Sequence, residues 1–159
     1  MIRHGYRGNR LRESIEEDVT MKIPKNINIL FIVGFGPVVR DASASRKFYA
    51  ETLGISFEED ATGYMYTAGL DGVKHFALWP LSQAARSCFN TTQWPDEFPV
   101  PQAWMEFDVE DIEKATIELT SRGYKLLVAT QKEPWGQTVT RLLGPEGLLV
   151  GITHTPSMR

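Results

Sequence analysis

The chain has 159 residues, of which 42% are hydrophobic and 23% charged, and these values fit one globular domain with a buried core. A formal net charge of −3 and a pI near 5.6 argue against nucleic acid as a partner, because binding to phosphates requires a basic face. The single cysteine, Cys88, excludes an internal disulfide, so a reducing compartment, the cytoplasm, is expected.

The first 26 residues are predicted to be a polar extension that is partly disordered, with a short helix over 10–19. They contain no apolar core of the kind found in a signal peptide, and they carry many arginines and glutamates. The longest apolar run, 27–39, is short and contains Gly34 and Gly36, so we expect no membrane span.

Residues 27–80 are predicted to form a first unit of one strand, one helix and three strands, written βαβββ. Residues 28–38 alternate as a strand does, and Asp41 is placed to cap a helix that stops at Gly54. Three short strands are then expected over 55–58, 63–67 and 73–79.

Residues 101–156 are predicted to repeat this βαβββ order after a linker over 81–100. A strand over 102–109 is followed by a helix from Asp111 to Arg122. The three closing strands are expected over 124–129, 137–143 and 148–153. This order of elements predicts the α+β fold class. In a tandem of similar units, each half usually covers the apolar face of the other.

The alternation within the two long strands predicts which residues face the helices and which face away. The helices are expected to cover Phe31, Val33 and Phe35 in the first unit and Met105, Phe107 and Val109 in the second. The opposite, concave face would then carry Ile32, Gly34 and Gly36 together with Trp104, Glu106 and Asp108. We place Asp108 at the strand end, in solvent or as a cap.

Three landmarks follow one another in the tandem units. These are Val39-Arg40-Asp41 with Phe48-Tyr49, Val109-Glu110-Asp111, and Gly136 followed by Gly144-Pro145-Glu146-Gly147. With these landmarks, residues 27–156 resemble the vicinal oxygen chelate superfamily, which groups glyoxalase I, extradiol dioxygenases, fosfomycin-resistance enzymes and bleomycin-resistance binding proteins. The resemblance implies a curved, cupped mixed sheet with helices on its outer faces. It also implies a homodimer, with which the apolar linker is consistent.

Catalytic members of that family hold a divalent metal on the concave sheet with His, Gln or Glu ligands. Carried over by the resemblance, the ligand positions are Gly34, Trp104, Gly151 and Ala77, with His75 close to the last of these. Glycine and alanine have no side-chain donor, and the indole N–H cannot coordinate a metal. We therefore expect neither a metal nor another cofactor.

Without metal ligands, the concave face is predicted to hold a planar or bulky organic molecule, similar to a drug or a toxin. Glycines at 34, 36 and 151 would widen the cavity, and Trp104 would provide a flat wall. Trp104 could equally fill the space that the glycines leave. Trp135 and Gly136 resemble a Trp-Gly pair of bleomycin-resistance proteins. Trp135 either borders the pocket or anchors a loop.

Glu106 and His75 are the candidate titratable groups on the concave face. Glu106 requires a partner if it is buried, either Arg141 or a cationic ligand; unpaired, it would have a raised pKa and could act as a general base. His75 is either a hydrogen-bonded core residue or a donor to the ligand. Two functions stay open: a binding protein without catalysis, and a lyase, isomerase or dioxygenase-like enzyme. The enzyme would use a metal on unconventional ligands, or Glu106 and His75 as acid and base.

Overall fold

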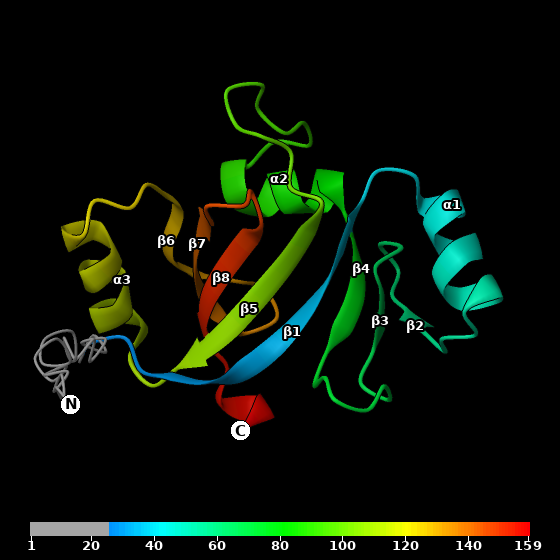
Figure 1. Cartoon of the computed structure of the whole chain (residues 1–159), viewed down its shortest axis with the longest axis horizontal. Coiled ribbons are helices and arrows are strands. Elements are labelled where there is room, and N and C mark those ends of the chain that lie inside the picture. Colours follow the sequence, from blue (N-terminus) through cyan, green and yellow to red (C-terminus); the bar gives the residue numbers. More distant parts are fainter. Residues whose placement is uncertain (1–25) are drawn as a thin grey trace, which may run out of the picture.

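The computed structural model describes residues 26–159, and its first half follows the predicted order of one strand, one helix and three strands (Figure 1). The elements are β1 (Ile29–Val39), α1 (Ala42–Arg46), the π-helix η1 (Lys47–Thr52), β2 (Glu58–Glu59), β3 (Met65–Thr67) and β4 (Phe76–Pro80). Asp41 caps α1, because its carboxylate accepts a hydrogen bond from the backbone N–H of Ala44 at 2.9 Å. Apart from Asn26, the polar extension predicted over residues 1–26 lies outside the described residues.

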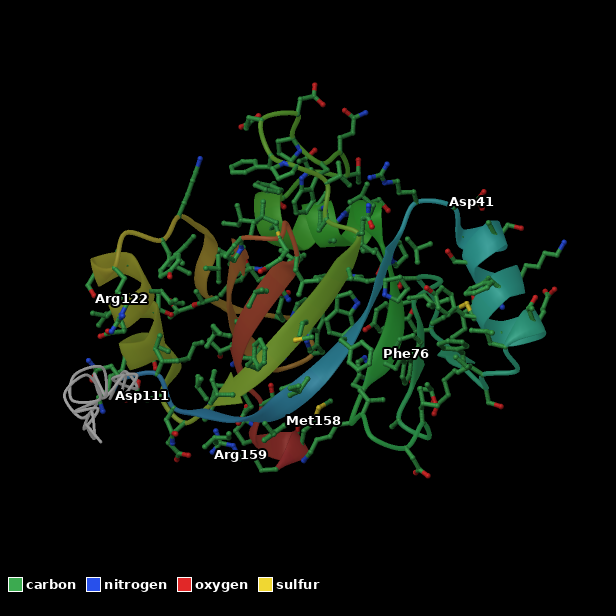
Figure 2. All side chains as sticks on the ribbon, viewed as in Figure 1. Asp41, Phe76, Asp111, Arg122, Met158 and Arg159 are labelled. Carbon is green, nitrogen blue, oxygen red and sulfur yellow. The ribbon has the colours of Figure 1, made fainter. Side chains whose placement is uncertain are left out.

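The second half repeats this order after one additional helix. The elements are α2 (Leu81–Phe89), β5 (Ala103–Val109), α3 (Ile112–Ser121), β6 (Leu126–Lys132), β7 (Thr138–Leu143), β8 (Leu149–His154) and the 3-10 helix η2 (Pro156–Met158). The carboxylate of Asp111 caps α3 by accepting a hydrogen bond from the backbone N–H of Lys114. Asp41 and Asp111 thus stand at the starts of their helices (Figure 2).

The segment 81–100 is not the plain linker that its prolines indicate, because α2 occupies its first nine residues. The buried residues of α2 are Ala84, Ala85 and Cys88, spaced as one face of a helix. These residues belong to one hydrophobic cluster with Trp79 and Trp104, and α2 lies across one end of the central strands (Figure 1). No helix in residues 26–159 has both the length and the apolar character needed to cross a membrane.

The eight strands form one mixed sheet in the order β2-β3-β4-β1-β5-β8-β7-β6. β1 and β5 lie antiparallel at its centre, and each is parallel to the last strand of its own unit, β4 or β8. The sheet curves between α1 and α3, which lie at its two ends (Figure 1). Residues of α3 pack against Val109 and Ile152, while Tyr49 of η1 packs against Phe76. The predicted α+β fold of tandem βαβββ units is confirmed.

A bulge in β1 changes which of its side chains face the cavity. The pairing of β1 with β5 shifts between Ile32 and Gly34, so Val33 has no partner residue of its own. Val33 is 3% exposed and lines the concave face, whereas Ile32 is 46% exposed on the outer side. The predicted positions of these two residues were therefore wrong, because strict alternation does not hold across a bulge.

Candidate functional site

A cavity of about 750 Å³ opens on the concave face of the sheet. Six aromatic or imidazole rings line it. They come from β3, β4 and the residue just before each of these strands, from β5, and from the loop between β6 and β7. These are Tyr64, Tyr66, His75, Trp79, Trp104 and Trp135. Pockets of this size that are walled by flat apolar rings are suited to organic molecules.

Trp104 lines the cavity. Its indole is 4% exposed, and its N–H lies 3.4 Å from the backbone carbonyl of Ala77, which accepts a hydrogen bond. Trp79 meets it edge to face, with the ring centroids 5.9 Å apart and the planes at 79°. This contact and hydrogen bond hold the ring in one orientation, so Trp104 both packs the core and lines the cavity.

On the first unit's side, three rings form a nearly parallel group. Tyr64 and Tyr66 have centroids 5.9 Å apart at 23°, and Tyr66 and His75 have centroids 5.6 Å apart at 23°. The hydroxyl of Tyr64 lies 2.9 Å from Nε2 of His75, within hydrogen-bond distance. His75 is therefore hydrogen-bonded within the protein, and it also lines the cavity, where it could contact a ligand.

Arg141 of β7 lies between two carboxylates at the floor of the cavity. Its Nη2 is 3.3 Å from Oε1 of Glu106, and its Nη1 pairs with Oε1 of Glu133. Nη1 also donates to the hydroxyl of Ser87 at 2.6 Å. Burial alone would lower the pKa of Arg141, but the two carboxylates outweigh burial and raise it, so the guanidinium stays charged. Of the two partners that the sequence left open for Glu106, Arg141 lies within ion-pair distance. Glu133 is a second partner of Arg141 that the sequence did not reveal.

Gln137 connects the floor of the cavity to its edge. Its amide N–H group donates to Oε2 of Glu106 at 3.0 Å and to Oγ1 of Thr155 at 3.1 Å. Its amide oxygen accepts from the indole N–H of Trp135 at 2.9 Å. Trp135 is 63% exposed at the cavity edge, so Gln137 restrains its ring. The sequence analysis missed Gln137, although it directly follows the Trp135-Gly136 pair.

Asp108 is buried, which corrects its predicted place in solvent or as a cap. One of its carboxylate oxygens accepts from the backbone N–H of Thr155 at 2.7 Å, and the other is 3.0 Å from Nε of Arg159. Figure 2 shows Met158 and Arg159 together at one edge of the sheet. Asp108 thus holds residues 155–158 against the cavity, which they line. The sequence around Asp108 does not reveal these contacts, because its partners are 47 and 51 residues away in the chain.

The glycines of the concave face allow close packing and do not widen the cavity, so the predicted mechanism of widening was wrong. Gly34, Gly36 and Gly151 are not among the cavity-lining residues. A Cβ at Gly36 would lie 1.9 Å from the backbone oxygen of Ala77, and one at Gly34 would lie 2.4 Å from that of His75. A Cβ at Gly151 would lie 2.7 Å from Cγ of Glu106. These distances are too short for real contacts, so the space beside each glycine is already filled.

The residues at the family's ligand positions do not fit a divalent metal. Gly34, Trp104 and Gly151 offer no coordinating atom, and the nearby His75 and Glu106 are hydrogen-bonded to other side chains. Within residues 26–159, no three His, Cys, Asp or Glu side chains gather in a way that could hold a metal ion. The chemistry of the cavity is that of aromatic rings, one amide and charged groups.

The stability of the protein is expected to fall as the pH drops below about 6.5, and His75 should contribute to this fall. Burial lowers the pKa of His75, and the charge of Glu106 only partly opposes it. As the solution becomes acidic, the unfolded chain therefore binds a proton before the folded protein does. Urea unfolding between about pH 7 and pH 5 measures this effect. The free energy of unfolding of His75→Gln should depend less on pH than that of the wild type. An unchanged dependence would show that His75 does not carry a lowered pKa.

Comparisons with known proteins agree with this architecture. The family model of the Glyoxalase/Bleomycin resistance protein/Dioxygenase superfamily matches residues 32–152. A search of curated proteins finds no significant match.

Solved structures with the same fold come from several bacteria. A member of the glyoxalase/bleomycin resistance protein/dioxygenase superfamily from Vibrio splendidus 12B01 is 19% identical over 81% of this chain and 99% of its own, with a TM-score of 0.51. A NAD-dependent benzaldehyde dehydrogenase from Legionella pneumophila is 11% identical over 76% and 96%, with a TM-score of 0.52. A hypothetical protein from Bacillus halodurans C-125 is 16% identical over 79% and 94%, with a TM-score of 0.51. At such identities the likeness shows the fold alone.

Proposed function

We propose that this chain, which belongs to the Glyoxalase/Bleomycin resistance protein/Dioxygenase superfamily, binds a small planar organic molecule in the cavity on its concave sheet. The observation that carries this proposal is the aromatic wall around the cavity. The ligand would be of drug-like or toxin-like size, because the volume of about 750 Å³ lies within the range of small-molecule pockets.

The orientation of the rings supports a flat ligand. Trp79 and Trp104 meet edge to face, and Tyr64, Tyr66 and His75 stack nearly parallel to one another. Flat ligands gain contact area from such walls, and each well-placed pair of rings is worth about 0.5–1.5 kcal/mol beyond the area that it buries. The exposed ring of Trp135 at the edge could then cover a bound molecule.

Binding has more support than catalysis, because the two candidate acid–base groups are already engaged. Glu106 pairs with Arg141 and accepts from Gln137, and His75 is bonded to Tyr64. A general base must be able to reach a proton of its substrate. The enzyme alternative stays a second proposal, and loss of turnover of some substrate in Glu106→Gln, with binding intact, would favour it.

The proposed homodimer would use a surface other than the linker. Phe89, Trp94 and Phe98, the apolar residues of segment 81–100, pack within the chain's own core cluster. The exposed apolar side chains of β1 lie on the outer side of the sheet, where Ile32 and Phe35 are 46% and 40% exposed. A second copy that covered them would leave the cavity on the opposite face open.

A bulky residue at the cavity edge is expected to abolish binding without disturbing the fold. Ser157 is exposed and lines the cavity, so Ser157→Trp would fill the entrance. Titration calorimetry with acridine, a flat tricyclic probe, should show binding to the wild type and at least a tenfold loss of affinity in the variant. Such a loss corresponds to about 1.4 kcal/mol.

The matched control is Ser82→Trp, which adds the same ring at an exposed position that does not line the cavity. It should bind acridine as the wild type does. Equal affinities in all three proteins would place acridine elsewhere and contradict the proposed site.

A further inference from the structure

Carboxylates outnumber cationic side chains around the cavity. Arg141 is the one Lys or Arg side chain, among the described residues, that lines it. Two buried carboxylates, Glu106 and Glu133, pair with this single guanidinium. Asp60 adds a further, exposed carboxylate at the cavity edge. Among the lining side chains, the formal positive charge of Arg141 stands against the formal negative charges of Glu106 and Asp60, so one negative charge is in excess. Glu133 does not line the cavity and pairs with the same guanidinium.

Arg141 cannot offer its charge to an anionic ligand. Its side chain is 1% exposed, and its two terminal nitrogens are bonded to Glu106, Glu133 and Ser87. Its guanidinium carbon also lies 5.1 Å from the centroid of Trp79, so the ring covers one side. An anion could reach these donors only by breaking a buried ion pair, which is strongly unfavourable.

The rings of the cavity favour positive charge for an independent reason. The face of an indole or phenol ring carries negative electrostatic potential, and cations bind over it when they are removed from water. Of the six rings, five belong to Trp or Tyr. The pKa of Tyr64 is raised by burial and also by the charges of Glu106 and Asp60, which means that a negative field reaches this wall of the cavity.

We propose that the cavity selects planar organic cations, with the positive charge of the ligand lying between the carboxylate of Glu106 and the aromatic walls. The inference rests on the proposed function and deepens it by naming the charge of the ligand. The observation that carries it is that the Arg141 guanidinium is fully paired and inaccessible, while two carboxylates and five Trp or Tyr rings line the same cavity. Planar anions of the same shape would be rejected.

Three flat probes that share one ring system test this selectivity. At pH 7.5, 9-aminoacridine is a cation, acridine is neutral, and acridine-9-carboxylate carries a negative carboxylate. In titration calorimetry at low salt, the wild type should bind 9-aminoacridine about tenfold more tightly than acridine, and acridine-9-carboxylate more weakly than both. The preference for the cation should shrink at high salt, because salt screens the charge at the open edge.

Two variants locate the source of the preference. Glu106→Gln should bring the affinity for 9-aminoacridine to within about twofold of that for acridine, because the carboxylate that faces the cation is removed. Because Glu106 belongs to a buried pair, a second variant tests the same point at an exposed position. Asp60→Asn changes an exposed carboxylate and should weaken the binding of 9-aminoacridine by about twofold. Glu97→Gln, in the exposed loop after α2 and outside the cavity, is the control and should behave as the wild type does.

The outcomes separate this inference from the function on which it rests. Equal affinity of the wild type for 9-aminoacridine and acridine would overturn the charge selectivity and leave the binding of planar molecules standing. Tightest binding of acridine-9-carboxylate would overturn it as well. If none of the three probes binds, the proposed function itself fails for planar tricyclic molecules, and the inference fails with it.

Discussion

Replacement of Arg141 by methionine is expected to lower the free energy of unfolding by about 3–5 kcal/mol, the range for removal of one partner from a buried ion pair. Methionine keeps much of the volume of the side chain but leaves Glu106 and Glu133 buried without a positive charge. Ser87 would also lose the donor to its hydroxyl. Urea denaturation at about pH 7, followed by circular dichroism, measures this change.

The control for Arg141→Met is Arg122→Met, which removes an exposed arginine paired with Glu118 on α3. Exposed pairs contribute little, so this variant should unfold close to the wild type. Adding Glu133→Gln to Arg141→Met should recover part of the lost stability, because it removes one of the unpaired carboxylates. A similar small effect of Arg141→Met and Arg122→Met would mean that water reaches the carboxylates in the folded protein.

The fold could be predicted from the sequence because its signals are local. Asp41 and Asp111 each accept from the N–H three residues ahead, so a cap is visible within a few residues of the chain. The alternation of residues 102–109 likewise placed Trp104 and Glu106 on the face that holds the cavity. The order of elements then followed from repetition of one unit.

The candidate site could be predicted only in part, because its partners are distant in sequence. Glu106 and Arg141 lie on strands that are not neighbours in the sheet, with β8 between them, and yet their side chains meet over Gly151. Glu133 comes from the loop end of β6, where no periodic pattern marks its direction. The bulge at Val33 is also invisible to alternation, since it inserts one residue without any characteristic sequence.

Replacement of Gly36 by alanine is expected to cost about 3 kcal/mol of unfolding free energy, at the upper end of the range for overpacked cores. The added Cβ would lie 1.9 Å from the backbone oxygen of Ala77 and 2.9 Å from its carbonyl carbon. Backbone atoms cannot rotate away as a side chain does, so β1 and β4 would have to separate. Urea denaturation of Gly36→Ala beside the wild type measures the loss.

Gly69→Ala is the matched control for this substitution. Its added methyl group would have Thr67 Oγ1 as its nearest neighbour, at 3.6 Å, an ordinary contact distance, so its stability should stay within about 0.5 kcal/mol of the wild type. If the close contact between β1 and β4 sets the shape of the cavity, Gly36→Ala should also weaken acridine binding, because Trp104 is hydrogen-bonded to the same carbonyl of Ala77. Stability equal to that of Gly69→Ala would show that the two strands can separate without cost. The glycine would then serve no packing role at the centre of the sheet.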